Sequence, residues 1–233
     1  MSTIIELKNL FKTFKLPHRR QVEVLKDVNL EIKEGEFVLV YGPSGCGKTT
    51  LLNLILGLET PTEGKVVVKD RNLAHMTTRK RSLFRLKNFG PVYQNQIWLK
   101  SLNVVENVAL PLYLAGRDKR TAIAHALGCL EIPGMTRFAK SRPNELSAGE
   151  QQRIGLARAL AVDAPIIVAD EPTGNIDSRA SDEMMSVFDT LNRRFKKTIV
   201  LVTHNQAYWT IGTRQVELLD GKIIKNNESG SKK

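Results

Sequence analysis

A glycine-rich segment, "GPSGCGKTT", carries the strongest chemical signal in the sequence. It fits the pattern G-x-x-x-x-G-K-S/T, follows the apolar run "FVLVYG", and precedes "LLNLILGL", which predicts a helix closed by Gly57. The glycines let backbone N–H groups turn towards phosphate oxygens, Lys48 reaches the β- and γ-phosphates, and the Thr49 hydroxyl ligates Mg²⁺. The segment therefore predicts a nucleoside triphosphate site built from Gly42, Pro43, Ser44, Gly45, Cys46, Gly47, Lys48, Thr49 and Thr50.

An acidic pair ends the apolar run in "PIIVADEP", at Asp170 and Glu171. Successive strand residues point in opposite directions, so the two carboxylates are expected to have different roles. We interpret Asp170 as a member of the Mg²⁺ shell, through water, and Glu171 as the group that polarises the attacking water. Taken alone, the pair favours a solvated turn before a helix; beside a phosphate loop it favours the nucleotide site.

A second apolar run, "IVLVTHN", ends at His204. A lone histidine is more often structural than catalytic, and the chain has four. His204 is the one expected at the carboxyl end of a buried strand, where parallel strands present their functional side chains. It is therefore the candidate for a role at the phosphates.

The elements that must position these groups alternate between strand and helix. The pattern predicts strands over the first forty residues, a basic amphipathic helix over 79–88, mostly helix up to about 158, and strand–helix alternation afterwards. Apolar strands without polar alternation favour a parallel sheet covered on both faces. Pro91 in "FGPVYQ" is tolerated only at a sheet edge or strand end, and the polar tail "KNNESGSKK" is expected to lack regular structure.

Bulk composition narrows the class of protein. The chain has 233 residues, 42% of them hydrophobic and 25% charged, which is typical of one globular domain with a smaller lobe. No apolar run is long enough for a transmembrane helix, and no signal peptide is evident, so we expect a cytoplasmic protein. Two cysteines favour reduced thiols. The net charge of +11 suits nucleic acid, an anionic membrane surface, or solubility alone.

The motifs together resemble those of the ATP-binding subunit of ABC transporters. "GPSGCGKTT", "LSAGEQQR", "IIVADEP", "NID" and "VTH" occur in that family's order and spacing, over about residues 3–225. "ADEPTGNID" and "VVENVALPL" are most similar to the lipoprotein-releasing and macrolide-exporting branch, whose members transmit force across a membrane. The resemblance implies an α/β P-loop NTPase fold: a mostly parallel sheet core with an antiparallel β subdomain and an inserted helical subdomain.

The resemblance also implies the division of the chain and further site residues. It predicts an ATP-binding core with an N-terminal β subdomain over 1–93 and 159–233, and a helical signature subdomain over 94–158. Ser147 and Gly149 would contact the ATP held by a second subunit, with the positive end of the following helix directed at it. Each site would then be shared by two chains, and a monomer would bind ATP but hydrolyse it poorly.

Further residues carry over one at a time. Gln94 matches the glutamine that reaches Mg²⁺ and the lytic water, and Asp177 matches the aspartate at the dimer interface. Phe14 matches the aromatic residue that stacks on adenine, with Phe11 as the fallback. His204 matches the histidine that holds the γ-phosphate and positions the glutamate. The implied catalytic set is Glu171, His204, Gln94 and Lys48, the metal set is Thr49, Gln94 and Asp170, and the cofactors are ATP and Mg²⁺.

One position departs from the family. Ala148 stands where glycine is usual, so its methyl group either crowds the γ-phosphate and restricts φ, or is tolerated with little effect. An ATPase rate unchanged in Ala148→Gly would indicate tolerance.

The implied partners are an integral membrane permease subunit and a second ATP-binding subunit, most simply another copy of this chain. The protein would lie at the cytoplasmic face of the cell membrane, where anionic lipid attracts Lys and Arg. The segment after Gln94 would receive a helix of the permease, with Trp98 and Leu99 as apolar lining. The alternative for these side chains is that they form part of the core of the helical lobe. The alternatives are a soluble ABC-type ATPase acting on nucleic acid, and a small-molecule kinase. The first is disfavoured because there are no coiled-coil heptads and only one cassette, and the second because it leaves the signature loop unexplained.

Overall fold

Two sheets form the framework of the protein. The structure, a computed structural model, describes residues 2–15, 17 and 21–228. The first sheet is antiparallel with the order β2-β1-β4-β5, and confirms the strands expected near the N-terminus. Its strands are β1 (Thr3–Lys15), β2 (Gln21–Lys33), β4 (Glu63–Val68) and β5 (Arg71–Asn72).

The second sheet is mostly parallel and has the order β10-β9-β3-β8-β7-β6. Among its described strands, only β10 runs antiparallel to its neighbour. The carboxyl ends of β3, β7 and β8, which precede the predicted functional segments, meet at one edge of this sheet. The strands are β3 (Phe37–Tyr41), β6 (Phe89–Val92), β7 (Ile166–Asp170), β8 (Thr198–Val202), β9 (Arg214–Leu219) and β10 (Lys222–Glu228).

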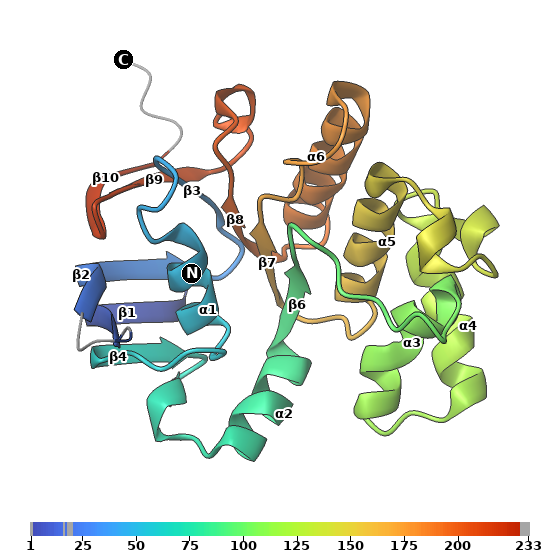
Figure 1. Cartoon of the computed structure of the whole chain (residues 1–233), viewed down its shortest axis with the longest axis horizontal. Helices are drawn as coiled ribbons and strands as arrows, with labels where there is room; N and C mark the ends of the chain where they lie inside the picture. The colour runs from blue at the N-terminus through green and yellow to red at the C-terminus, as the bar shows by residue number, and fades with distance from the viewer. Residues whose placement is uncertain (1, 16, 18–20, 229–233) are drawn as a thin grey trace.

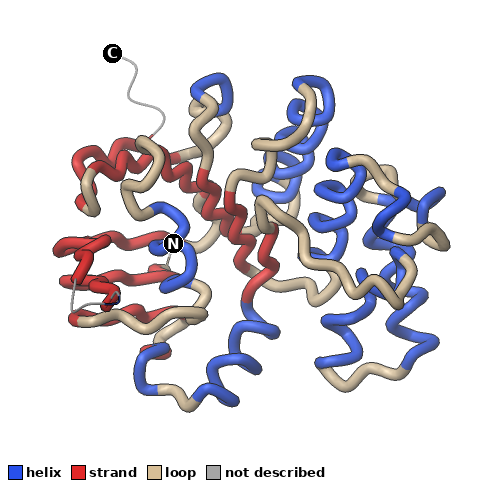
Figure 2. Tube along the Cα trace, viewed as in Figure 1, coloured by secondary structure: helices blue, strands red, loops and turns tan. Residues whose placement is uncertain are grey.

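Both faces of the second sheet are buried, as the apolar strands predict. In β3, Phe37 and Leu39 pack into one hydrophobic cluster, together with the helices α5 (Ala148–Leu160) and α6 (Ser178–Arg193). Val38 and Val40 pack into the other cluster, together with α1 (Lys48–Ile55) and the antiparallel sheet. Because successive side chains of a strand point to opposite faces, a strand covered on both sides must be apolar throughout. Figure 2 shows the strands between helices on one side and the antiparallel sheet on the other.

The helices are distributed unequally over the two faces. α1 lies between the two sheets, α5 and α6 cover the opposite face of the parallel sheet, and α3 and α4 lie beyond α5 (Figure 1). The basic helix expected over 79–88 is present as α2, below β6 in Figure 1. The helices are α1 (Lys48–Ile55), α2 (Thr78–Asn88), α3 (Val104–Leu114), α4 (Lys119–Glu131), α5 (Ala148–Leu160) and α6 (Ser178–Arg193).

Two local expectations are confirmed and one is wrong. Gly57 follows the end of α1 with a φ of 65°, the left-handed conformation that glycine adopts readily after a helix. Pro91 lies in β6, at the edge of the sheet, where its missing N–H breaks no ladder. The expectation that the tail lacks regular structure is wrong over 225–228, because β10 pairs there with β9. Residues 229–233 lie outside the described part. The predicted subdomain boundary after 158 falls in the last turn of α5.

Candidate functional site

The glycine-rich loop joins β3 to α1 in a tight curl. Gly42 has a φ of 153°, and a Cβ there would lie 2.0 Å from the carbonyl oxygen of Leu218. Gly47, the N-cap of α1, has a φ of 108°, and a Cβ there would lie 2.8 Å from Leu25. Both positions therefore exclude larger side chains, and α1 directs its free N–H groups at the cavity beside the loop.

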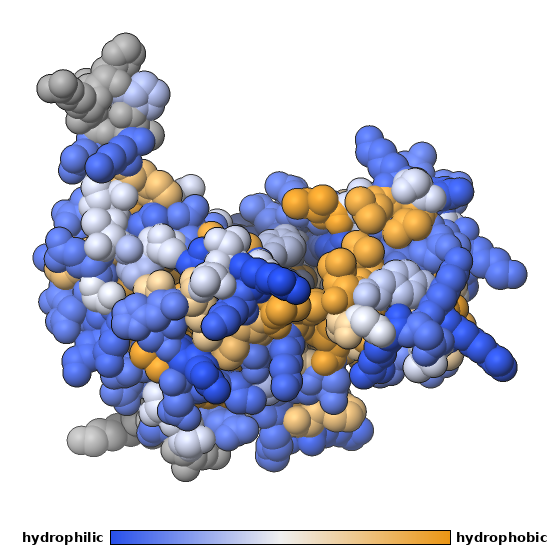
Figure 3. Space-filling model, turned by 90° about the horizontal axis from the view of Figure 1, so that it is seen from below, coloured by the Kyte–Doolittle hydropathy of each residue, from blue (hydrophilic) through white to orange (hydrophobic). Residues whose placement is uncertain are grey.

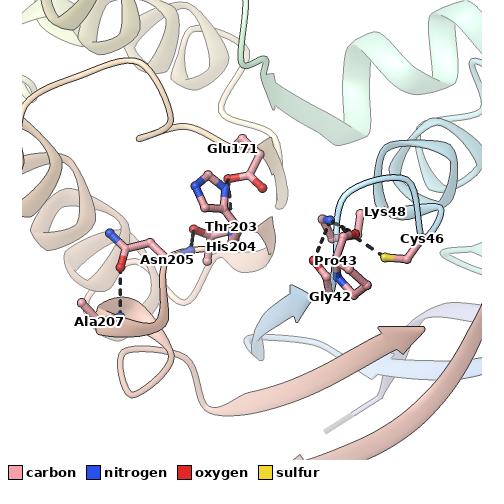
Figure 4. A network of polar contacts seen from close by, with 9 residues as sticks. All are labelled: Gly42, Pro43, Cys46, Lys48, Glu171, Thr203, His204, Asn205 and Ala207. Atoms are coloured by element: carbon pink, nitrogen blue, oxygen red, sulfur yellow. Dashed lines mark hydrogen bonds and ion pairs between the residues drawn. The ribbon is translucent and has the colours of Figure 1, made fainter. Parts of the chain in front are cut away.

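The side chain of Lys48 folds back into the loop that precedes it. Its Nζ donates to the carbonyl oxygens of Gly42 and Pro43, at 2.9 Å each, and lies 3.9 Å from the Cys46 sulfur (Figure 4). These bonds place an ammonium group, itself largely buried, on the inner side of the curl. A phosphate group entering the loop would meet both this charge and the N–H groups of α1.

A cavity of about 530 Å³ brings the predicted groups together. It opens at the carboxyl edge of the parallel sheet, where ligands of α/β proteins bind. One lining residue, from β2, was not predicted. The lining residues are Val24, Ser44, Gly45, Gly47, Lys48, Thr49, Thr50, Gln94, Asp170, Glu171 and His204.

Val24 reaches the cavity through an irregularity in β2. The register passes from Lys12 opposite Leu25 to Thr13 opposite Glu23, so Val24 is an extra residue on its strand. Such a β-bulge turns a side chain away from the regular alternation. No feature of the sequence signals this bulge.

Asp170 carries a buried oxygen that suits a cation. Its Oδ1 has no hydrogen-bond partner among the described residues. Burial raises the pKa of the Asp170 carboxyl above its ordinary value, while the Thr49 hydroxyl and the Lys48 ammonium oppose this rise. No group of three or more His, Cys, Asp or Glu side chains in the described part could hold a metal by itself. The oxygens of Asp170 and Thr49 therefore fit Mg²⁺, which takes few protein ligands and completes its shell with water and phosphate.

Glu171 and His204 are in direct contact. Glu171 Oε2 accepts a hydrogen bond from the His204 backbone N–H at 3.3 Å and lies 2.8 Å from Nδ1 of its ring (Figure 4). The carboxylate is mostly buried, whereas the imidazole is 68% exposed. Glu171 has a φ of 45°, and its N–H donates to Val202 at 3.0 Å. A non-glycine residue held in this conformation is typical of a functional site.

The predicted partner-facing residues lie outside this cavity, at the starts of two neighbouring helices. Ser147 caps α5, and its backbone N–H and hydroxyl both donate to Glu150 at 2.9 Å. Asp177 caps α6 by accepting from the Ala180 N–H at 3.0 Å, which lowers the pKa of its carboxyl. The two helix starts are adjacent, since a Cβ on Gly149 would lie 3.7 Å from that of Ala180. Both caps are exposed.

Ala148 is the first residue of α5 and is exposed. It is absent from the described residues that have a positive φ, so glycine would bring no relief of backbone strain there. The part of the Ala148 hypothesis that rests on φ does not apply, and crowding of a phosphate by its methyl group remains a hypothesis.

Phe14, the predicted adenine contact, does not line the cavity. It is half-buried on β1, opposite Val22, with the Lys12 Nζ 4.6 Å from its ring centroid. Phe11 is also half-buried on β1 and does not line the cavity. Adenine stacking on Phe14 stays a prediction.

A buried amide network, missed in the sequence, holds two of the functional loops together. Gln152 of α5 donates to the carbonyl oxygens of Tyr93 and Pro172, at 3.1 and 3.2 Å. Those two residues flank Gln94 and Glu171 in the chain. Gln96 in turn donates to Gln152 at 2.8 Å. α5 therefore fixes the backbone on both sides of the cavity. The sequence gives no clear signal of this network, because the glutamine pair lies among other polar and charged residues of the helix.

The fold and the site define a P-loop nucleoside triphosphatase. Comparisons with known proteins narrow this class. The family model for ABC transporters matches residues 25–174. An ABC transporter ATP-binding protein of Methanocaldococcus jannaschii is 42% identical over 95% of this chain and 98% of its own. The lipoprotein-releasing system ATP-binding protein LolD of Bacteroides fragilis is 38% identical over 95% and 100%.

A solved structure agrees over the whole fold. A dimeric, post-hydrolysis state of the ATP-binding cassette MJ0796, bound to ADP and Pi, superposes with a TM-score of 0.92 at 38% identity, over 97% of this chain and 99% of that chain. The chain therefore belongs to the ABC transporter family, as an ATP-binding subunit that hydrolyses ATP. No helix in the described part of the chain has the length and apolar character needed to cross a membrane.

Proposed function

We propose that two copies of this chain close head to tail around two ATP molecules and thereby drive a membrane partner. The observation that carries the proposal is the separation, within one chain, of the phosphate cavity from Ser147, Gly149 and Asp177. Exposed helix starts with free N–H groups suit an anion supplied by another subunit. The MJ0796 cassette has itself been solved as a dimer, at 40% identity to this chain.

Within each site, different residues of the chain would bind the phosphates, orient the attacking water and contact the base. Lys48 and the loop N–H groups would bind the phosphates, and bound Mg²⁺, held by Thr49, Asp170 and Gln94, would neutralise charge on them. Glu171 would accept a hydrogen bond from the attacking water and orient it in line with the γ-phosphorus. His204, already in contact with Glu171, would hold that carboxylate in place and donate to the γ-phosphate. Phe14 would stack on adenine.

A groove of about 490 Å³ is the proposed seat of the membrane partner. It lies between α2, β6, α3 and α5, and its exposed apolar side chains include Ile97, Leu114 and Leu83, which are 77, 66 and 55% exposed. Figure 3 shows apolar side chains gathered on this otherwise mostly hydrophilic face. An amphipathic helix fits such a groove.

The side chains that line this groove differ in part from the sequence expectation. Trp98 turns inward: its Nε1 donates to Gln151 at 2.9 Å, and Arg158 lies 4.4 Å from its ring centroid. Leu99 is 47% exposed, but it does not line the groove. Trp98 therefore follows the core alternative, since it packs against the larger hydrophobic cluster, and Ile97 lines the groove in its place. Contact of Leu99 with a partner helix stays a prediction.

We further infer the force-transmitting branch and a position at the cytoplasmic face of the membrane. LolD proteins of Bacteroides fragilis and Chlorobium chlorochromatii, named for lipoprotein release, match nearly the whole chain at 38 and 36% identity. In this branch, closure of the dimer would pull α3 to α5 and with them the helix seated in the groove. Loss of the γ-phosphate would reopen the dimer.

The test of the proposed function is Glu171→Gln. The amide keeps the size of the side chain but cannot serve as a base, so ATPase turnover should fall at least about 100-fold. ATP-driven dimerisation, followed by gel filtration, should persist or strengthen, because the phosphate contacts remain. Turnover close to that of the unmodified chain would remove Glu171 from the catalytic role, and dimers that form equally without nucleotide would contradict the shared site.

A further inference from the structure

A second cavity, of about 670 Å³, lies on the other side of α2 from the apolar groove. Its rim carries four cations: Lys69 and Arg71 from the β4–β5 hairpin, and Lys80 and Lys87 from α2. The half-buried Met76 and Phe84 contribute an apolar lining, and Asp70 is the only acidic residue among its described lining. The site described above uses none of these residues.

The positive charge of this region is concentrated and uncompensated. Residues 69–88 hold seven Lys or Arg and one Asp, a net charge of +6 out of +11 for the whole chain. None of the four rim cations forms an ion pair within the described residues. All four are exposed. Positive and negative side chains are usually interspersed on a protein surface, so a cavity lined by four exposed cations without ion-pair partners indicates an anionic ligand.

The hairpin holds its part of the rim in an unusual conformation. Lys69 and Asp70 have φ values of 47° and 59°, two consecutive left-handed residues between the paired Val68 and Arg71. Tight hairpin turns of this kind normally use Asn and Gly, so a lysine is a costly choice there. The turn projects Lys69 at the rim next to Arg71.

The two faces of α2 differ in a way that fits a membrane surface. One face, with Leu83 and Leu86, lines the apolar groove, while the other, with Lys80 and Lys87, lines the cationic cavity. The choice of lipid as the ligand of this cavity rests on the proposed function, because a membrane protein bound in the groove would bring α2 close to the lipid headgroups. Exposed lysines beside exposed leucine suit a surface that is both anionic and apolar.

We propose that this cavity binds the phosphate headgroups of anionic phospholipids and holds the subunit against the membrane. Each Lys or Arg near an anionic bilayer strengthens partition roughly fivefold, so removing two rim cations should weaken it by about 25-fold. A lipid headgroup and a soluble phosphate ester present the same phosphate group to these cations, and the experiment distinguishes the two ligands.

The test is co-sedimentation of the full chain with vesicles, in the absence of any membrane partner. Vesicles of phosphatidylcholine alone are compared with vesicles that contain about one third phosphatidylglycerol, at physiological salt. The expected result is binding to the anionic vesicles only, weakened about 25-fold in Lys80→Gln/Lys87→Gln. The matched control, Lys8→Gln/Lys222→Gln, removes the same charge from exposed positions on β1 and β10 and should bind nearly as well as the unmodified chain.

Several results would overturn the proposal. Equal binding to both kinds of vesicle would show that binding does not depend on anionic lipid. Equal weakening in the two double variants would show that binding depends only on the net charge of the protein and not on this cavity. Release by millimolar glycerol 3-phosphate would identify a soluble phosphate ester as the ligand, and release by a short DNA duplex would identify nucleic acid. ATPase activity and ATP-driven dimerisation are measured in parallel. If the unmodified chain showed neither, the proposed function would be refuted. If it showed both but did not bind anionic vesicles, only the lipid site would be refuted.

Discussion

Gly155 offers a quantitative test of the amide network that joins α5 to the functional loops. A Cβ at this position would lie 2.3 Å from Cδ and 2.4 Å from Nε2 of Gln96. The Gln96 side chain would have to leave its place in Gly155→Ala. It would then lose its hydrogen bonds to Tyr93 and Gln152, both 2.8 Å, and the bond it accepts from Arg158 at 2.7 Å.

The expected cost follows from these three bonds. Two neutral hydrogen bonds contribute about 1 kcal/mol each, and one with a charged donor about 1.5–3 kcal/mol. Alanine recovers about 1 kcal/mol over glycine within a helix. The free energy of unfolding of Gly155→Ala should therefore fall by roughly 2.5–4 kcal/mol. ATPase turnover should fall with it, because Gln94 lies two residues from the displaced side chain.

Urea unfolding of the full chain measures this loss, with a matched control and a double-mutant cycle. Gly128 is exposed in α4, and a Cβ there would meet no described atom within 4 Å, so Gly128→Ala should gain about 1 kcal/mol. In a Gln96→Ala background, Gly155→Ala should likewise become stabilising, since the obstructed side chain is gone. If Gly155→Ala stabilises the otherwise unmodified chain as much as Gly128→Ala does, the reasoning is refuted.

Two further predictions concern buried titratable groups. Burial raises the pKa of Asp170 in the folded chain above its value in the unfolded chain. The ionised carboxylate therefore lowers the free energy of unfolding at neutral pH, and this cost disappears as the pH falls below the ordinary Asp pKa of about 4. Without nucleotide and Mg²⁺, Asp170→Asn should therefore raise the thermal midpoint at pH 8 by a margin that shrinks towards pH 4; a lowered midpoint at pH 8 would contradict this. Burial also raises the pKa of Cys129 to about 11, so about 0.1% of it is thiolate at pH 8, against roughly a quarter of an ordinary cysteine. In the Cys46→Ser chain it should react with a thiol reagent over about 100-fold more slowly when native than in urea, and comparable rates would contradict its burial.

The sequence predicted those parts of the fold in which local pattern and packing agree. The runs that became β3, β7 and β8 are apolar throughout because both faces of the sheet are covered. The glycine loop has almost no freedom of its own, since Gly42 and Gly47 admit no side chain. The residues that end these strands were found for the same reason: parallel strands bring their carboxyl ends to one edge.

The features that sequence did not predict depend on contacts between distant segments. The bulge at Val24 arises from the register between β1 and β2, and the tail over 225–228 is ordered by pairing with β9 and not by its own composition. The Gln96–Gln152 network joins residues 56 positions apart. The choice between groove and core for Trp98 could not be made from the sequence, because nothing in the local sequence indicates that Gln151 and Arg158 would hold it inward.

Mixing two inactive variants tests the shared site most directly. Lys48→Ala disables the phosphate loop and Ser147→Arg the signature helix, so each variant alone should hydrolyse ATP at a small fraction of the normal rate. In a one-to-one mixture about half of the dimers are mixed, and each of these has one complete site, so activity should return to about a quarter of that of the unmodified chain. A mixture no more active than its components, or full activity of Ser147→Arg alone, would contradict a site built from two chains.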